Sequence, residues 1–419
     1  MLDTLGARDV GFGDDVPYRA EAWERVDRGE RPADDDLAEA FFHLARVEER
    51  RAPRDEHDRV RASSSSLDPL DPPLERLRRR LGVEPPRWGG ARFAVALTHD
   101  VDTPWKWTRR GLIGAAARMK ADLLGRRLGS AFREGRGLAA APLHKLRGSD
   151  PFWSFDRILA DERRAGGSST FFVMAAHAHE LDGPAPESYE RLRPRLVETL
   201  LEGGAEVGLH GSYSAADNPA QLAAEKERLE ELSEPVRGQR YHFLRLDPHR
   251  NLGDVEKAGF LYDSTLGFAD APGFRAGIAQ PFRPWDFERE APRGIVEVPL
   301  AAMDVTLSAE RYLNLGARQA EARLRALLDW AADNGGGFAV LWHSEQFDSA
   351  LMPGWGRLYR RFMEDVRVRG GICVQAGALA VEAREWLSCA HERRFIASGW
   401  DGSARPRSSC SSSALPRPP

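Results

Sequence analysis

The chain reads FAVALTHDVD from Phe93 to Asp102, a short apolar run that ends in two carboxylates. In an extended strand alternate side chains share a face, so Asp100 and Asp102 point the same way and His99 points the other way. Two carboxylates this close repel each other unless a cation lies between them or one of them binds a proton. The run therefore predicts a cation site or a functional pair of acids. A polar turn, with Asp capping the next helix, is the alternative.

The composition of the whole chain is that of a globular protein with a highly charged surface. Hydrophobic residues make up 42% of the 419 residues and charged residues 30%, which allows one large domain with appendages or two ordinary domains. The net charge of -4 gives no global indication of binding to nucleic acid or membranes. Cys373, Cys389 and Cys410 are too few for a disulfide framework or a zinc cluster.

The N-terminal residues bear on the cellular compartment in which the protein is expected. MLDTLGARDVGFGDD has neither a basic start nor an apolar stretch, so it does not read as a secretory signal, and nowhere do about 18 apolar residues run together. The expected compartment is the cytoplasm, with the inner face of the membrane as a peripheral position.

Composition divides the chain into three parts. Residues 1–90 are predicted to be an N-terminal extension, with one short helix over 36–46 and a linker rich in Ser, Pro and Asp over 61–73. Residues 388–419 lack apolar periodicity, so a disordered tail is expected there. Residues 91–387 remain as the main domain.

Short β-rich runs alternate with helical stretches in the main domain. The predicted strands cover 92–97, 169–174, 205–209, 241–246, 295–298, 337–342 and 371–375, and the predicted helices cover 154–165, 188–202, 219–232, 309–334 and 355–369. Such alternation favours parallel strands with helical crossovers, hence an α/β sheet or barrel. In a barrel the chemistry lies at the C-terminal ends of the strands.

A basic segment interrupts this alternation. Residues 106–147 contain eleven Lys or Arg and two acidic residues, interleaved with apolar residues. One interpretation is a pair of solvated insertion helices. The other is a docking surface for anionic lipid or a polyanionic glycan. Nucleic acid is not expected, because no recognised binding motif accompanies the charge.

Two further strands are predicted to end in histidine. AEVGLHGSYS, over 205–214, places His210 at a strand end, and GFAVLWHS, over 337–344, places His343 in the same way. A carboxylate and an imidazole are suitable ligands for zinc or a similar divalent ion, while a free carboxylate and a free imidazole beside them provide a base and an acid.

Four motifs in order resemble the polysaccharide deacetylase (NodB-homology, carbohydrate esterase) family. They are THDVD, LHGSYS, RYHFLRLDPHRNLGDVEKAGFLYDSTLGFADAPGFRAG over 240–277, and LWHS. The resemblance covers about residues 91–380 and is closest to a branch whose first motif reads THDVD rather than TFDD. It implies a distorted barrel of the (β/α)7 type and a metal-dependent hydrolase that cleaves a linear amide.

The activity that this resemblance implies is removal of acetyl from an amino sugar of an envelope or exported polysaccharide, or of its lipid-linked precursor. A non-catalytic relative that binds glycan or protein partners, and another metal-dependent carbon-nitrogen hydrolase, are the alternatives. The implied cofactor is a divalent metal, with zinc as the first expectation. The oligomeric state is left open.

The resemblance also assigns roles. Asp100 matches the catalytic base, Asp102 the metal-binding Asp, His210 the first metal His and His343 the general acid. The family's second metal His falls on Ser214, and a hydroxyl is a poor zinc ligand.

His242 is the first candidate to replace the missing imidazole, and His99 is the second. The arginine that orients the base is expected in the same segment as His242, where Arg240 and Arg245 both lie and where we select Arg245.

Further candidates are expected around the reacting groups. Asp263 is predicted to pair with and orient His343, with Asp304 as the alternative; a turn cap is the other interpretation of Asp263. Tyr213 and Trp342 are candidates for stacking on sugar, although aromatic residues at these spacings also fit a core. Trp105 and Trp285 are further candidates of the same kind.

Overall fold

The computed structural model describes residues 19–183, 185–233 and 235–397. Its main sheet is parallel throughout, with strand order β8-β5-β4-β3-β2-β1-β10-β9 and β11 paired to β1. The strands are β1 (Phe93–Val101), β2 (Thr170–Val173), β3 (Glu206–Gly211), β4 (Gly238–Tyr241), β5 (Tyr262–Asp263), β8 (Val296–Glu297), β9 (Leu300–Met303), β10 (Gly336–Leu341) and β11 (Ile372–Val374). A separate antiparallel pair consists of β6 (Trp285–Asp286) and β7 (Ala291–Pro292).

One continuous stretch closes this sheet into a distorted barrel. β8 and β9 are separated only by Val298 and Pro299, yet β8 pairs with β5 and β9 pairs with β10. The same stretch therefore joins both ends of the strand order. β11 pairs with the first half of β1 and β2 with the second half, which adds to the distortion. The predicted α/β barrel is confirmed.

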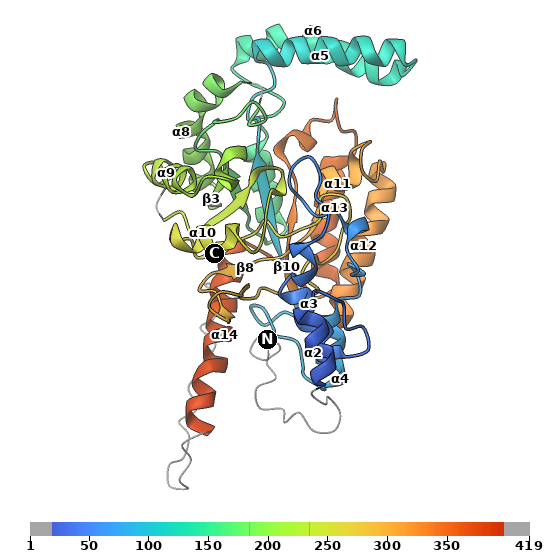
Figure 1. Cartoon of the computed structure of the whole chain (residues 1–419). Coiled ribbons are helices and arrows are strands. Elements are labelled where there is room, and N and C mark those ends of the chain that lie inside the picture. Colours follow the sequence, from blue (N-terminus) through green and yellow to red (C-terminus); the bar gives the residue numbers. More distant parts are fainter. Residues whose placement is uncertain (1–18, 184, 234, 398–419) are drawn as a thin grey trace.

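Helices surround the barrel, most of them on the connections between strands and the last one after β11 (Figure 1). They are α7 (Phe155–Arg164), α8 (Pro186–Glu202), α9 (Pro219–Glu230), α10 (Asn251–Lys257), α11 (Asp304–Ser308), α12 (Ala317–Asn334), α13 (Trp355–Val368) and α14 (Ala376–Ala397). The start of α9 follows from its sequence, because the Asn218 side chain accepts from the Gln221 amide and Pro219 occupies the first turn. Short 3-10 turns are η1 (Val47–Arg50), η2 (Ala62–Ser64), η3 (Tyr213–Ala216), η4 (His242–Leu244) and η5 (Ser344–Phe347).

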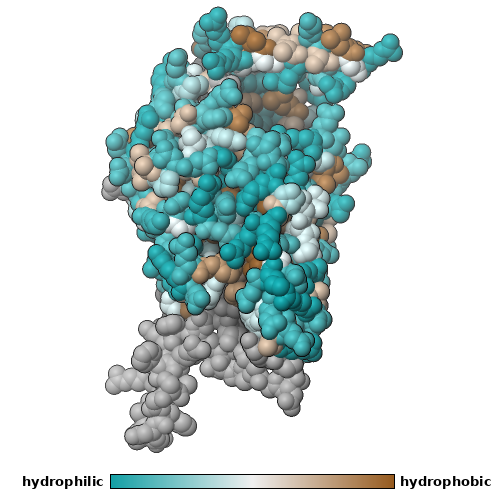
Figure 2. Space-filling model, in the orientation of Figure 1, coloured by the Kyte–Doolittle hydropathy of each residue, from teal (hydrophilic) through white to brown (hydrophobic). Residues whose placement is uncertain are grey.

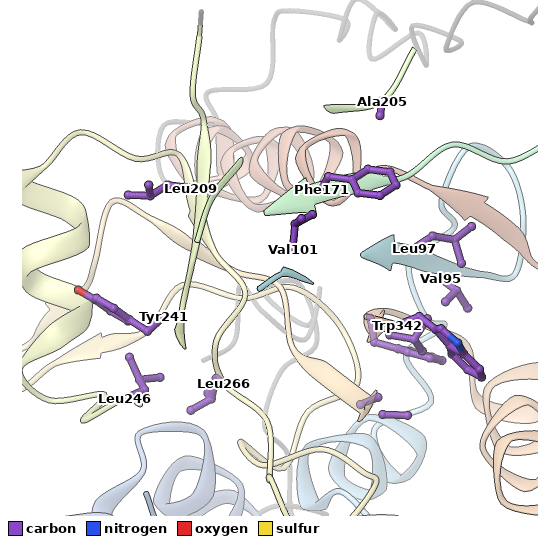
Figure 3. Packing of buried hydrophobic residues seen from close by; sticks show 14 of the residues in the cluster. Val95, Leu97, Val101, Phe171, Ala205, Leu209, Tyr241, Leu246, Leu266 and Trp342 are labelled. Atoms are coloured by element: carbon purple, nitrogen blue, oxygen red, sulfur yellow. The ribbon is translucent and has the colours of Figure 1, made fainter. Parts of the chain in front are cut away.

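The two faces of β1 have different partners. Val95 and Leu97 belong to the large apolar cluster beneath the surrounding helices (Figure 3). Ala94 and Ala96 pack in a second cluster with side chains of the other strands and of α14. Because side chains alternate along a strand, Asp100 lies on the same face as Ala94 and Ala96, at the end of β1. The small side chains of Ala94 and Ala96 are fully buried among the larger side chains of this second cluster.

The N-terminal part packs on the barrel. It contains α2 (Ala20–Asp27), α3 (Asp36–Leu44) and α4 (Pro73–Arg80). Buried Glu49 binds Arg275 at 2.7 and 2.8 Å, and it also pairs with Arg46. Burial alone would raise the pKa of Glu49, but the charges of Arg275 and Arg46 lower it to about 2. Within the segment 61–73, the Pro69 carbonyl accepts from the Phe274 amide at 2.7 Å.

The basic insertion forms a helical hairpin. Its helices, α5 (Arg109–Leu124) and α6 (Leu128–Arg147), pack on each other and project from one end of the molecule (Figure 1). At the other end α14 runs to Ala397, so this helix includes the first residues of the segment 388–419. The rest of that segment, 398–419, lies outside the described residues. No helix within the described ranges is long and apolar enough to cross a membrane.

Candidate metal centre and catalytic site

Asp102, His210 and His242 converge at the C-terminal ends of β1, β3 and β4, with β2 lying between β1 and β3 in the sheet. Each offers one possible ligand atom, and these atoms lie within 4.8 Å of one another. Asp102 Oδ1 is 3.2 Å from His210 Nε2 and 3.7 Å from His242 Nε2. Asp102 follows β1, His210 lies in β3, and His242 follows β4, so the barrel order brings them together.

The hydrogen bond of Nδ1 in each of the two histidines, His210 and His242, fixes Nε2 as the atom that faces Asp102. His210 Nδ1 lies 2.9 Å from the Arg240 carbonyl oxygen, and His242 Nδ1 lies 3.2 Å from Asp182 Oδ1. Since those partners only accept, each Nδ1 carries the proton and donates it. In the neutral tautomer both Nε2 lone pairs then face Asp102 Oδ1. A divalent cation bound by Asp102 Oδ1 and by the two Nε2 atoms fits this set of ligands.

The pKa values of Asp102 and His242 also indicate a cation site. Asp102 Oδ1 is buried and has no hydrogen-bond partner of acceptable geometry among the described residues. Burial would lower the pKa of His242, but the charge of Asp102, together with the charge of Asp182 and the hydrogen bond to it, raises that pKa to about 9. Burial would raise the pKa of Asp102, yet His242 and His210 hold it well below its usual value. The site therefore favours a positive charge, as a proton or as a cation.

Asp182 is a residue that the sequence analysis missed. It is fully buried, and besides His242 it accepts from the amides of Tyr213 at 2.7 Å and His179 at 2.8 Å. A carboxylate behind a ligating histidine fixes the ring and raises its basicity. The sequence did contain one indication of Asp182: it is an acidic residue in the loop after β2, at the same end of the barrel as the other site residues.

A strained turn brings His242 into the site. Phe243 and Leu244, which directly follow it, have positive φ values of 61° and 55°. Each such non-glycine residue costs on the order of 1–3 kcal/mol, and such strain is concentrated at functional sites. Arg59 Nη1 donates to the Phe243 carbonyl at 2.9 Å and so helps to hold the turn.

Asp100 is held by Arg240 rather than by Arg245. Arg240 Nη1 donates to Asp100 Oδ1 at 2.8 Å and to Thr98 Oγ1 at 2.9 Å, and its Nε donates to the Ser264 carbonyl at 2.7 Å. Arg245, our selection from the sequence, instead donates to the Tyr213 carbonyl and pairs with Asp217. Arg240 lies in β4, whereas Arg245 follows the turn η4, and residue spacing alone does not reveal which of the two reaches Asp100.

His343 is held by Asp304, the alternative named in the sequence analysis. Its Nδ1 donates to Asp304 Oδ1 at 2.7 Å and its backbone amide to Oδ2 at 2.6 Å. Burial would lower the pKa of His343, but Asp304, followed by Asp102 and Asp100, raises it well above its usual value.

Asp263 does not contact His343. It accepts from the amide and hydroxyl of Thr265 at 2.8 and 2.9 Å and from Gln239. The turn-cap interpretation describes this contact with Thr265.

Three other residues from the sequence analysis lie away from the metal ligands. His99 is buried between Glu162 Oε1 at 2.8 Å and the Trp342 carbonyl at 2.6 Å, on the opposite face of β1. Trp342 belongs to the buried apolar cluster (Figure 3). It is 2% exposed and its ring packs on Trp355 and Tyr359, so it cannot stack on a sugar. Ser214 is not among the residues that line a pocket together with Asp102, His210 and His242, and its Oγ has no partner among the described residues.

Tyr213 lies beside the site. It is partly exposed, and its hydroxyl is 3.3 Å from His57 Nδ1. The Arg245 guanidinium lies 4.6 Å from the centre of its ring.

A pocket of about 130 Å³ opens over these groups. Its lining comprises Arg59, Asp100, Asp102, His210, His242, Phe243, Leu244, Met303, Val305, Arg311, Tyr312, Leu341 and His343. Arg59 comes from the N-terminal part and binds Asp55 and the Tyr312 hydroxyl. Nothing in the sequence around Arg59 indicates this position, because tertiary packing alone brings it there.

Searches for similar proteins return solved structures only. No protein-family model matches the chain, and no curated protein matches it. The solved structures include a candidate polysaccharide deacetylase from Mycobacterium smegmatis, 20% identical, with a TM-score of 0.48 over 72% of this chain and 94% of that one. A similar candidate from Pseudomonas aeruginosa PAO1 is 16% identical, with a TM-score of 0.45 over 72% and 95%. A peptidoglycan deacetylase from Bacillus subtilis is 13% identical, with a TM-score of 0.34 over 74% and 98%. Identities this low leave the chemistry to be inferred from the residues of the site.

Proposed function

We propose that this chain is a metal-dependent hydrolase that removes acetyl from an N-acetylated amino sugar of a polysaccharide or of its precursor. The observation that carries the proposal is the Asp102, His210 and His242 group, flanked by two further groups that can move protons. Asp100 Oδ2 lies 3.7 Å from His210 Nε2 on one side. His343 Nε2 lies 3.8 Å from Asp102 Oδ2 on the other.

A divalent cation, with zinc as the first expectation, would be held by Asp102, His210 and His242 and would supply Lewis acidity to the acetyl carbonyl and to water. Asp182 holds the His242 ring, and the Arg240 carbonyl holds the His210 ring, so both ligating nitrogens keep their direction.

Asp100 is suited to the role of base. Its Oδ1 is occupied by Arg240, which leaves Oδ2 directed toward the site. Asp100 takes the proton of the attacking water, and the acetyl carbon becomes tetrahedral as the new carbon-oxygen bond forms.

His343 is suited to the role of acid. Asp304 holds its Nδ1 proton and raises its pKa, so Nε2 is protonated and lies in the pocket lining. When the carbon-nitrogen bond breaks, Nε2 gives its proton to the departing amine, which would otherwise leave poorly. Acetate and the free amino sugar are the products.

The pocket lining supports a small acyl group. Leu244, Met303 and Leu341 are the apolar contacts expected for the acetyl methyl, and Tyr312 is the contact expected for a sugar ring.

Acetate release tests this proposal. The chain, freed of metal by a chelator, is offered a panel of N-acetylated glycans and small N-acetyl amides before and after zinc or another divalent ion is added. We expect release from at least one glycan only with metal. Asp100→Asn should lose about 10²-fold or more in rate while it keeps the metal, and Arg245→Gln is the matched control. Release without metal, or none from any glycan by the metal-loaded chain, would overturn the proposal.

A further inference from the structure

The α5 and α6 hairpin leaves the barrel directly after β1, at the end where Asp102 lies. Among its residues only Ala115 and Asp122 of α5 and Ala131, Glu134 and Ala141 of α6 are buried. These are the side chains expected between two closely packed helices. Most of the surface of both helices therefore faces away from the rest of the protein (Figure 1).

Exposed apolar side chains gather on this hairpin. Eight of the twelve large apolar side chains that are exposed in the described residues lie here: Leu112, Ile113, Leu123, Leu124, Leu128, Phe132, Leu143 and Leu146. Figure 2 shows apolar residues interspersed with hydrophilic ones along the hairpin. On α6 the spacing of Leu128, Phe132, Leu143 and Leu146 puts them on one helical face, and they are 67%, 66%, 47% and 84% exposed. Scattered single residues need no explanation, but a contiguous stripe does.

The charge of the hairpin is strongly basic, although the chain as a whole has a net charge of -4. Its two acids are already paired, Asp122 with Arg127 at 2.8 Å and Glu134 with Arg118 at 2.7 Å. No salt bridge to the other basic side chains of the hairpin is found among the described residues. These are Arg109, Arg110, Lys120, Arg126, Arg133, Arg136, Lys145 and Arg147.

We propose that this hairpin docks on the surface of an anionic lipid bilayer. The apolar stripe would enter the boundary between headgroups and acyl chains, and the unpaired basic side chains would reach the anionic headgroups. A second copy of the chain is a poor occupant, because two hairpins with this excess of positive charge repel each other. The proposal does not depend on the deacetylase activity. If both hold, docking keeps the pocket close to substrate at the membrane.

Vesicle cosedimentation of the full chain tests the proposal. The chain should bind vesicles of equal parts phosphatidylcholine and phosphatidylglycerol, bind pure phosphatidylcholine weakly, and dissociate as salt rises. In one variant set Leu124, Leu128 and Phe132 become Ser, and in the other Arg126, Arg136 and Lys145 become Gln. Each basic residue removed should lower the partition coefficient about fivefold. Leu201→Ser with Val368→Ser is the matched control, since these exposed apolar residues lie elsewhere and should not matter.

The two variant sets are independent, so a folding defect in one leaves the other informative. Zinc-dependent acetate release from a soluble substrate and the unfolding temperature report on folding. Equal binding to both vesicle types, no binding by the wild type, or unchanged binding by both sets would overturn the proposal. So would a dimer, seen by sedimentation velocity, that the Ser variant dissociates, because the stripe would then be a contact between copies.

Discussion

Replacing Asp304 by Asn should shift the pH dependence of catalysis. Asp304 is fully buried, and its two oxygens accept from His343 Nδ1 at 2.7 Å and from the His343 amide at 2.6 Å. The variant keeps the shape but removes the charge, and an opposite charge at such a distance changes a pKa by about one to three pH units. The folded pKa of His343 is raised above its usual value, so loss of the charge lowers it. The alkaline limb of kcat/KM then moves to lower pH, because the acid loses its proton earlier.

The assay is acetate release from the best substrate across the pH range, with metal loading kept equal. Asn can accept at only one of the two contacts, so an unfolding free energy lower by about 1–3 kcal/mol is also expected. Asp263→Asn is the matched control: it is a buried aspartate that binds Thr265 and does not touch His343. An unshifted alkaline limb in Asp304→Asn, or an equal shift in Asp263→Asn, would refute the assignment of His343 as the acid that Asp304 holds.

Three further predictions concern the groups behind the reacting residues. Asp182→Asn should weaken zinc affinity by about 10–100-fold, measured by competition with a chromogenic chelator, since the carboxylate holds His242; unchanged affinity would show that His242 is not a ligand. Arg240→Gln should lower the unfolding free energy by about 3–5 kcal/mol in urea titrations, because it leaves buried Asp100 without its partner, while Arg245→Gln should change it little. Glu49→Gln should also lower the unfolding free energy by about 3–5 kcal/mol near neutral pH. Since the folded pKa of Glu49 is about 2, the difference between wild type and variant should shrink as the pH falls from the ordinary pKa of a glutamate toward 2. A difference that stays constant over this range would count against the ion pair with Arg275.

The fold could be predicted largely from local patterns. The alternation of β-rich and helical runs indicates parallel strands, and the start of α9 at Asn218 and Pro219 follows from capping chemistry. The closure of the barrel could not be predicted in this way, because β8 and β9 are short and their pairing with β5 and β10 depends on contacts distant in sequence. The contacts of Glu49 and Pro69 with the barrel are equally non-local.

The candidate site, like the fold, could be predicted only in part from the sequence. Residues at strand ends, Asp100, Asp102, His210 and His343, are visible in the sequence because the barrel brings such ends together. The residues that hydrogen-bond to these four cannot be identified in the sequence, since three-dimensional position determines which residue becomes the partner. Arg240 and Arg245 are equivalent in sequence, and only the course of the turn after β4 separates them.

The same holds for the residues on which the sequence analysis left alternatives. Asp263 is the last residue of β5 and Asp304 directly follows β9, and the geometry alone puts Asp304 against His343. Trp342 directly follows Leu341, which lines the pocket, so by the alternation of side chains Trp342 packs outside the barrel, where it is buried.

The proposed chemistry depends most on Asp102, His210 and His242 forming one metal site without Ser214. The most direct measurement is the zinc content and zinc affinity of the full chain, by elemental analysis and calorimetry, in the wild type, His242→Ala and Ser214→Ala. We predict one ion per chain in the wild type and in Ser214→Ala, and loss of stoichiometric zinc in His242→Ala. Stoichiometric zinc in His242→Ala, or its loss in Ser214→Ala, would contradict this account of the site.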